Sequence, residues 1–477
     1  MGRPVRSYHP TKQGHMLLFL AARVLSAVGN LVALAIFSRM AGPVTYGEYL
    51  LIFAWTSIVY GFSTQWMRFA FFGVYRREAA GDYIASFGIL LSAALIGVAV
   101  VLSGLWVSGI AGPEFLTAVF ILLVSMAGYE ALLEISRTRL KAGTVAVLML
   151  LRAGLVIVFG AAALTMTGSA VSLAFAVALA HVGAAIPGIM AIRDVRLAPS
   201  GHAMRSLIIY GWPLLISFGV MAVGQSVDRL LLAHFGGAGA LGPYGVVADF
   251  LRQAFMVVGE SIAMALVTVA KQHANSGERE DADRVLRHAF NACMATATFG
   301  AVFFLVFGDV VVRLLVGEAF YEPTRTQIPL FAIAFGFMTM RNFYFAQVIY
   351  FSNASHLELI GSLVFVATSA LLATLLVPWE GAMGAAIALM SAHIVACVLF
   401  VVVGRRHYRM PVDKKGFVVI SLMALATLIA DVAIQHFITA PMLAMAAKAL
   451  VFAAAGGAVI LRFNLLHLSR PRREGEA

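Results

Sequence analysis

Charged side chains lie inside long apolar runs of this sequence, and they are the residues that could do chemistry. A guanidinium in such a setting can hold phosphate or carboxylate oxygens through two parallel hydrogen bonds. A carboxylate there can pair with a cation or carry a proton. The cations that could bind an anionic ligand are Arg23, Arg68 and Arg252. Asp228, Arg229 and Asp249 are candidates for ion pairs, and Glu130 and Glu260 are carboxylates that could carry a proton.

The composition indicates which solvent surrounds these charges. Of the 477 residues, 61% are hydrophobic and only 12% are Asp, Glu, Lys or Arg, whereas soluble domains carry about 25% charged residues. The chain therefore lacks the polar residues needed to cover a soluble protein of this size. It is predicted to be an all-α polytopic membrane protein.

Apolar runs long enough to cross a bilayer recur along the whole chain. A transmembrane helix needs about 20 apolar residues, and about fourteen segments meet this length. Almost nothing remains for a soluble domain. The segments start near Met16, Glu48, Tyr83, Pro113, Thr144, Ser169, Ser206, Pro243, Phe290, Gln327, Glu358, Gly381, Gly416 and Pro441.

The basic residues are distributed asymmetrically between the connectors. A basic segment precedes every odd-numbered span except the eleventh, and the connectors around Gly42, Gly112, Gly168, Gly237 and Pro378 carry essentially no Lys or Arg. Because an excess of Lys and Arg marks the cytoplasmic side, both termini are predicted to be cytoplasmic. The formal net charge of +11 is then a topology signal, and no nucleic-acid partner is expected.

The sequence offers little to hold a metal or a cofactor. Its two cysteines, Cys293 and Cys397, lie in apolar runs without metal-ligand spacing and are predicted to be packing residues. The phosphate-binding pattern G-x-x-x-x-G-K-[ST] does not occur. We therefore expect no metal, no cofactor and no hydrolysis of ATP.

Two short segments resemble each other at one fixed offset. Aligning "RMAGPVTYGEYLLIFA" with "HFGGAGALGPYGVVAD" pairs Gly42 with Gly237, Gly47 with Gly242, and Tyr49 with Tyr244. Both segments join an outward-ending helix to an inward-running one, which predicts a parallel repeat of two six-helix lobes. The predicted divisions are 1–200 and 201–410, followed by 411–477 with two extra helices and a basic cytoplasmic tail.

The same segments carry a family resemblance. "FSRMAGPVTYGEYLLIF" resembles the first external loop of polysaccharide flippases in the multidrug/oligosaccharidyl-lipid/polysaccharide (MOP) superfamily, where an R-x-x-G-P-x-x-Y/F-G-x-Y pattern occurs. "YGWPLLISFGVMAVGQSVDRLLLAHFGGAGALGPYGVVADFLR" resembles the seventh and eighth spans of that family, with a Y-G-x-P-x-L start and a D-R-x-x-L pattern. The resemblance covers most of the chain by topology, but only these two blocks by motif.

The resemblance implies a fold, a function and partners. Two six-helix lobes would surround a central cavity, and the protein would flip undecaprenyl-diphosphate-linked oligosaccharide across the bacterial inner membrane. The product would serve synthesis of O antigen, exopolysaccharide or capsule. Membrane lipids, a polysaccharide polymerase and chain-length machinery are the other implied partners.

The resemblance also suggests roles for the charges. Arg23, Arg68 and Arg252 would bind the diphosphate; alternatively, Arg252 pairs with Asp249, and the other two reach lipid phosphates. Asp228 and Arg229 would hold the outer rim as a gate, or simply anchor the helix at the interface. Glu130 and Glu260 would carry protons.

Two other functions remain open at the level of sequence. A drug or metabolite exporter related to the multidrug and toxic compound extrusion (MATE) transporters would need acidic groups for cationic substrates, whereas the first, second and eighth predicted spans each carry an arginine, Arg23, Arg68 and Arg252. A membrane polysaccharide polymerase would need a sizeable outer loop with catalytic carboxylates or a metal site. Because the outer connectors are short, the chain is predicted not to be an enzyme.

Overall fold

The structure is a computed structural model that describes residues 10–352, 354 and 356–465, and every element among them is helical. The predicted all-α class is confirmed. The basic residues Arg3, Arg6, Arg470, Arg472 and Arg473, which support the predicted orientation, lie outside the described residues. The chain divides into two compact units, Met1–Val246 and Val247–Ala477.

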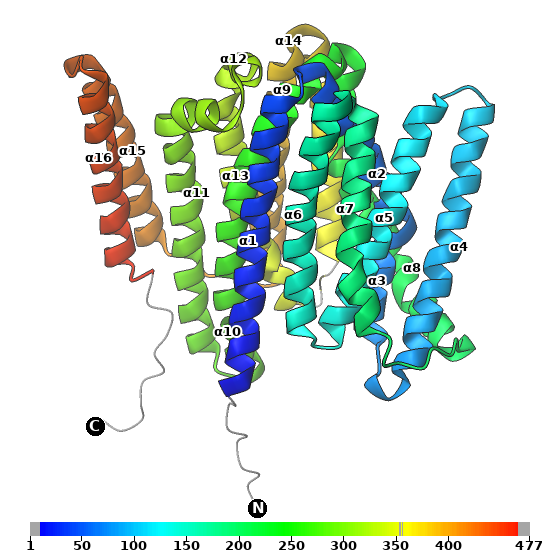
Figure 1. The fold of residues 1–477 in the computed structure, drawn as a ribbon. Helices are drawn as coiled ribbons and strands as arrows, with labels where there is room; N and C mark the ends of the chain where they lie inside the picture. The colour runs from blue at the N-terminus through cyan, green and yellow to red at the C-terminus, as the bar shows by residue number, and fades with distance from the viewer. Residues whose placement is uncertain (1–9, 353, 355, 466–477) are drawn as a thin grey trace, which may run out of the picture. The chain divides into compact units, whose positions relative to one another are not determined.

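The first unit contains the helices from α1 to α8 and the beginning of α9 (Figure 1). Proline occupies the first turn of α2 and of α5, directly after the extended residues Gly42 and Gly112. This arrangement suits a helix start, because the first turn leaves its N–H groups unpaired in any case. The elements are α1 (Pro10–Met40), α2 (Pro43–Tyr60), a π-helical segment η1 (Gly61–Gln65), α3 (Trp66–Val74), η2 (Arg77–Ala79), α4 (Ala80–Val107), α5 (Pro113–Thr138), α6 (Ala142–Thr167), α7 (Ala170–Ala191) and α8 (Gly201–Gly224).

Three basic connectors of the first unit meet at one end. Arg139 and Lys141, which follow α5, both contact Asp194, which follows α7, at 3.1 and 3.2 Å. Ser86 of α4 exchanges hydrogen bonds with the backbone of Ser200. The connections α3–α4, α5–α6 and α7–α8 accordingly lie at the lower edge of Figure 1. This agrees with the predicted clustering of basic loops on one side of the membrane.

Helix α9 (Val227–Ile262) is broken at Gly237, where φ is 75° and ψ is 175°. A positive φ of this kind is accessible to glycine and costly for residues with a Cβ. Gly237 therefore separates an arm of Val227 to Gly236 from a second arm that begins at Ala238. The break falls in the connector that the sequence predicts between the seventh and eighth spans.

The second unit continues from α9 to the C-terminal helices. Its core packs α11, α13 and α14 around Phe290, Cys293, Phe343, Tyr344 and Phe400. The elements are η3 (Ala263–Val267), α10 (Thr268–Asn275), α11 (Arg279–Leu315), α12 (Glu318–Thr324), η4 (Arg325–Gln327), α13 (Ile328–Phe343), η5 (Phe345–Tyr350), α14 (His356–Gly404), α15 (Lys414–Phe437) and α16 (Pro441–Arg462).

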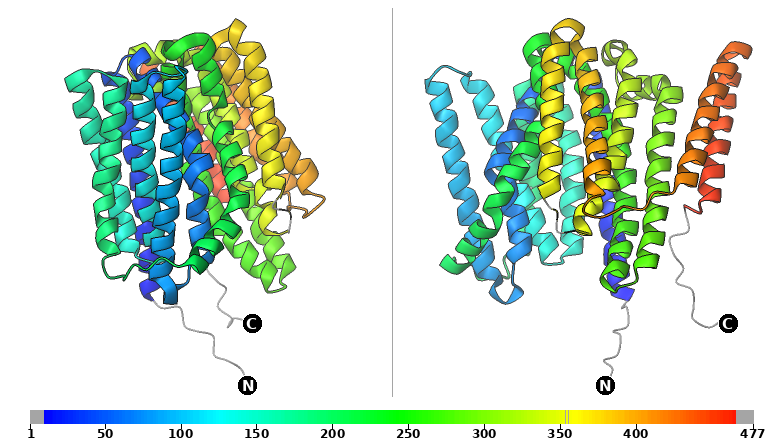
Figure 2. Two further views of the ribbon diagram at one scale, coloured as in Figure 1. Left: turned by 90° about the vertical axis from the view of Figure 1, so that its right-hand side faces the viewer. Right: turned by 180° about the vertical axis from the view of Figure 1, so that it is seen from behind.

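Helix α14 is a hairpin. At Gly381 the backbone has φ 54° and ψ −130°, which interrupts the helix. Gly384 lies against the backbone of Leu376, and Figure 2 shows the yellow and orange arms side by side, joined at the bend. Each arm exceeds the roughly 20 residues that a bilayer crossing needs.

By length and composition, 12 helices of the described residues could cross a membrane, compared with the fourteen segments predicted. Two features account for the difference. The arms of α14 count as one candidate of 49 residues, and the continuous helix Pro43–Val74 does not qualify, because Glu48, Arg68 and several polar residues interrupt its apolar run.

Candidate functional site

Arg68 and Glu130, predicted separately as an anion-binding cation and a coupling carboxylate, form an ion pair. Nη1 of Arg68, on α3, donates to Oε2 of Glu130, on α5. The same nitrogen donates to the hydroxyl of Tyr60, the last residue of α2, at 3.0 Å. The side chains of Arg68 and Glu130 are 20% and 26% exposed, so the pair is only partly buried.

The π-helical segment explains how Tyr60 reaches Arg68. In a regular α-helix, eight residues advance the direction of a side chain by about 800°, which leaves the two residues about 80° apart. One inserted residue in a π turn brings the effective separation to seven residues and the difference to about 20°. Residues Gly61–Gln65 form this turn. The local backbone irregularity therefore places Tyr60 and Arg68 on one face.

Arg152, on α6, is a second cation in the first unit. Its Nη2 donates to Oδ1 of Asn30 at 3.2 Å, and its guanidinium lies 5.8 Å from the ring centroid of Tyr129. The edge of the His181 ring meets the same tyrosine. Both direct partners of Arg152 are neutral, so its positive charge is retained. Arg23 lies half-buried on α1, the helix that also supplies Asn30.

Asp228 and Arg229 are both buried, with 4% and 7% exposure. Oδ2 of Asp228 accepts a hydrogen bond from the hydroxyl of Tyr244 at 2.6 Å, across the break at Gly237. This hydrogen bond links the two arms of α9. The gate role and the alternative of simple anchoring at the interface both remain predictions.

The repeat-related glycines Gly47 and Gly242 face each other. A Cβ on Gly47 would lie 3.0 Å from the backbone nitrogen of Gly242, and a Cβ on Gly242 would lie 3.2 Å from that of Gly47. The same two Cβ atoms would overlap the carbonyl oxygens of Ala238 and Pro43, respectively. Since Pro43 and Ala238 are also related by the repeat offset, the contact is reciprocal.

Arg252 and Asp249 form the predicted pair in the second unit. Nη2 of Arg252 lies 2.6 Å from Oδ1 of Asp249, three residues earlier on α9, and the two side chains are 33% and 21% exposed. Glu260 lies half-buried farther along the same helix. The structure thus forms the ion pair, whereas binding of a ligand by Arg252 remains a prediction.

Two further ion pairs of the second unit involve charges outside the candidate site residues named above. Arg341 of α13 lies 3.2 Å from Glu358 of α14, and Lys448 of α16 lies 2.7 Å from Asp431 of α15. Gln435 also donates to Asp431. The sequence shows these charges, but their partners lie on other helices, so no spacing rule could have paired them.

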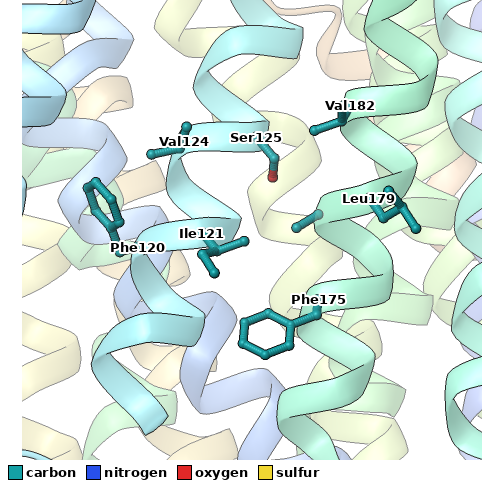
Figure 3. Close-up of a pocket in the computed structure, with 8 residues that line it drawn as sticks. Phe120, Ile121, Val124, Ser125, Phe175, Leu179 and Val182 are labelled. Carbon is teal, nitrogen blue, oxygen red and sulfur yellow. The ribbon is translucent and has the colours of Figure 1, made fainter. Parts of the chain in front are cut away.

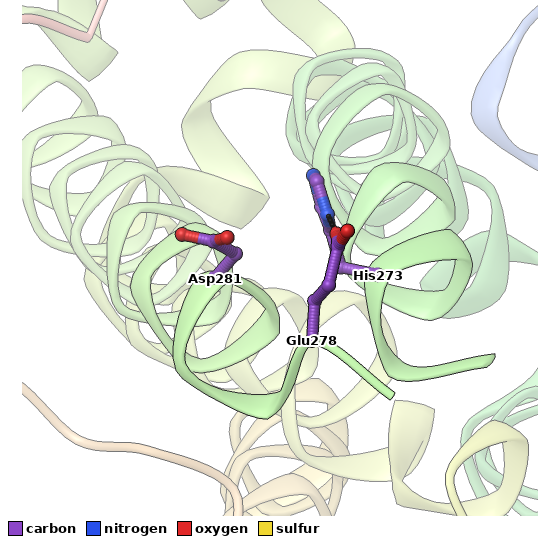
Figure 4. Close-up of side chains that lie close together, drawn as sticks. All are labelled: His273, Glu278 and Asp281. Carbon is purple, nitrogen blue, oxygen red and sulfur yellow. Dashed lines mark hydrogen bonds and ion pairs between the residues drawn. The ribbon is translucent and has the colours of Figure 1, made fainter. Parts of the chain in front are cut away.

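The described residues contain one group with metal-ligand atoms close together, His273, Glu278 and Asp281 (Figure 4). Nδ1 of His273 lies 2.5 Å from Glu278, which is exposed. Glu278 directly precedes α11, and Asp281 lies in its first turn and pairs with Arg284. Acidic groups at a helix N-terminus are stabilised by the helix dipole, which explains this grouping without an ion.

An apolar groove of about 370 Å³ lies between α5 and α7 (Figure 3). Its lining includes Phe120, Ile121, Phe175 and Leu179. The hydroxyl of Ser125, which the figure shows beside the groove, donates to a carbonyl of its own helix. The groove suits hydrocarbon and offers nothing to a charged head group.

The fold has counterparts among solved transporter structures. The structure titled "Lipid II flippase MurJ, inward closed conformation" matches with a TM-score of 0.73 at 14% identity, covering 94% of this chain and 100% of that chain. An inward-facing multidrug resistance transporter of the MATE family and MOP superfamily matches with a TM-score of 0.62 at 16% identity. It covers 82% of this chain and 97% of that chain.

A third structure, of a MOP superfamily transporter from Pyrococcus furiosus, matches with a TM-score of 0.56 at 16% identity over 82% of this chain and 93% of that chain. No family model matches the sequence, and no curated protein matches it. The chain is a multi-pass membrane protein with the fold of MOP superfamily transporters. The proteins that share this fold are transporters rather than enzymes.

Proposed function

We propose that this protein flips a polyprenyl-diphosphate-linked oligosaccharide across the bacterial inner membrane by alternating access, for synthesis of O antigen, exopolysaccharide or capsule. The observation that carries the proposal is the correspondence with a lipid II flippase along nearly the whole of both chains. The motif "RMAGPVTYGEY" favours the polysaccharide branch of the superfamily over lipid II itself.

The charges within the helices support an anionic cargo. Four acids, Glu130, Glu134, Asp249 and Asp431, each have an Arg or Lys partner, and Asp228 accepts from a tyrosine. A carboxylate neutralised in this way attracts a cationic drug only weakly, and its partner Arg or Lys attracts an anion equally weakly until the pair opens. Arg152, in contrast, contacts neutral groups. The balance therefore favours an anionic cargo over the exporter alternative.

Arg23, Arg68 and Arg252 are the proposed contacts for the diphosphate. A guanidinium holds two phosphate oxygens at once and is more weakly hydrated than an ammonium, so it is suited to a partly dry site. Diphosphate carries the negative charge, whereas the sugars vary between glycans. We infer that these arginines provide affinity for the shared part of the ligand.

The chain is proposed to cross the membrane fourteen times, with both termini in the cytoplasm. The two arms of α14 and the continuous helix Pro43–Val74 supply the crossings beyond the 12 candidates. The last two crossings, α15 and α16, are proposed to lie outside the twelve-helix repeat. The basic connectors of the first unit support the orientation.

Binding and flipping can be tested with purified protein in proteoliposomes. Undecaprenyl diphosphate carrying a labelled oligosaccharide is the principal probe, and lipid II and a cationic dye are the comparison probes. The proposal expects saturable binding and protein-dependent exposure of the labelled glycan in the opposite leaflet. Uptake of the dye without binding of either diphosphate lipid would favour an exporter, and flipping of lipid II alone would assign the chain to peptidoglycan synthesis.

A further inference from the structure

We propose that Glu130 is a proton-binding site that controls the availability of Arg68. With Glu130 ionised, the guanidinium is held in the ion pair, whereas a proton on Glu130 releases the guanidinium to bind the anionic head group of the ligand. The inference rests on the proposed function. It assigns the coupling between proton binding and cargo binding to the pair of Arg68 and Glu130.

The donors of Arg68 are unevenly used. Nη1 is shared between Glu130 and Tyr60, while the buried Nε finds no hydrogen-bond partner among the described residues. A buried donor without an acceptor costs about 1–3 kcal/mol relative to a satisfied one. The guanidinium has five donors in a fixed fork, so once it is released from Glu130 it can present Nε together with its other donors to a phosphate. Arg68 is thus positioned for an acceptor that Glu130 does not supply.

The depth of the pair suits proton exchange. At about 1.5 Å per residue, Arg68 and Glu130 lie roughly 9–12 Å from the ends of α3 and α5 that carry the basic connectors. Their side chains are 20% and 26% exposed, so neither is sealed within the helix packing. Ionisable residues at such a level are costly in a membrane and commonly serve ion or proton pathways.

The surroundings of Glu130 contain charged and titratable groups from several helices. Its own helix contributes Tyr129 and Glu134, and Glu134 pairs with Arg137 at the helix end. The helices packed against α5 contribute Tyr60 from α2, Arg68 from α3, Arg152 from α6 and His181 from α7, and the charged residue of α4 is Asp82 in its first turn. Among the described residues, Arg68 is the cation that forms an ion pair with Glu130, so protonation of Glu130 acts first on this ion pair.

Linkage makes the coupling reciprocal. If protonation of Glu130 raises the affinity for a diphosphate by some factor, binding of the diphosphate raises the affinity for the proton by the same factor. A coupling of one pKa unit corresponds to a tenfold change in affinity. Wild-type protein is therefore expected to take up protons when the ligand binds.

The experiment measures the dissociation constant of undecaprenyl diphosphate for the full chain in nanodiscs at pH 8 and pH 5.5. Glu130→Gln mimics the protonated state. It is expected to bind at least about tenfold more tightly than wild type at pH 8 and to lose the additional gain that wild type shows at pH 5.5. Because the lipid itself titrates, the Glu130→Gln protein also reports the ligand's own contribution.

Glu134→Gln is the matched control, since it makes the same change one turn farther along α5 and is expected to keep the pH dependence. Arg68→Gln is expected to bind weakly at both pH values. Proton uptake by wild-type protein in weak buffer, followed with a pH indicator, needs no variant and remains informative if Glu130→Gln fails to fold.

The outcomes separate the two proposals. If wild-type protein binds undecaprenyl diphosphate but neither takes up protons nor differs from Glu130→Gln in pH dependence, the proton site is refuted and the flippase function stands. If wild-type protein binds no diphosphate lipid at either pH, the proposed function fails, and the coupling fails with it.

Discussion

Gly47 and Gly242 approach each other so closely that neither position has room for a side chain. A Cβ on one would lie 3.0 Å from the backbone nitrogen of the other, and in the reverse direction 3.2 Å. The two residues are equivalent in the predicted internal repeat, so the approach joins matching points of the two predicted halves. Helix crossings of this kind depend on small residues, because they let two backbones come into contact.

Substitution of either glycine by alanine is expected to destabilise the protein, because the methyl group would overlap a backbone carbonyl of Pro43 or Ala238. Overpacking typically costs about 1–3 kcal/mol. A lower unfolding temperature in detergent would show it. Gly42→Ala is the matched control from the same connector, since nothing lies within 4 Å of its added Cβ. Equal stability of Gly42→Ala and Gly47→Ala would contradict the crossing.

Tyr244→Phe removes the donor to the buried carboxylate of Asp228. A buried acceptor that loses its partner costs about 1–3 kcal/mol, so the variant should unfold at a lower temperature. Tyr350→Phe, at a site where the tyrosine is 53% exposed, provides the comparison. If both variants unfold at the same temperature as wild type, the hydrogen bond between Tyr244 and Asp228 contributes nothing to stability.

The pair of Lys448 and Asp431 predicts non-additive substitutions. Lys448→Met leaves Asp431 as an uncompensated charge between α15 and α16 and is expected to cost about 3 kcal/mol. Combining Lys448→Met with Asp431→Leu should recover most of that loss, because no isolated charge then remains. Thermal unfolding of the two single variants and the double variant completes a mutant cycle. Additive losses would show that the two charges act independently.

Arg23→Ala and Arg252→Ala are expected to reduce surface polysaccharide without lowering the amount of protein in the membrane. Each substitution removes a proposed contact to the diphosphate and leaves the apolar helix faces intact. Polysaccharide and protein can be measured on blots of the same cells. Arg284→Ala, at a side chain that is 75% exposed, is the control. Normal polymer in the protein lacking both Arg23 and Arg252 would refute the anion-binding role.

Acid is expected to loosen the start of α15. The backbone N–H of Gly416 and the amide of Asn291 both donate to Asp413, which holds the pKa of this carboxyl below its usual value. The resulting stabilisation is present above the ordinary aspartate pKa of about 3.9 and is lost as the pH falls through the lower, folded-state value. Unfolding temperatures measured from pH 6 to pH 3 should therefore fall more for wild type than for Asp413→Asn. Parallel curves would show that Asp413 makes no pH-dependent contribution.

The apolar pattern was sufficient to predict the class of fold and the approximate positions of most helices. Burial of about 20 apolar residues in hydrocarbon is a local property, so it can be read along the chain. The predicted break near Gly237 also agrees with the structure. The bend at Gly381 lies in the connector predicted around Pro378. It divides α14 into two arms, although length and composition alone count α14 as one candidate span.

The sequence by itself determined that the chain belongs in a membrane, which residues are charged within it, and where two glycine-rich connectors repeat. Only the tertiary structure decided which charges form ion pairs: Arg68 with Glu130, and Lys448 with Asp431. The physical reason is that helix periodicity relates residues three or four positions apart, whereas these partners lie on different helices. The π turn at Gly61 strengthens the point, because one inserted residue changes which face of the helix carries Arg68.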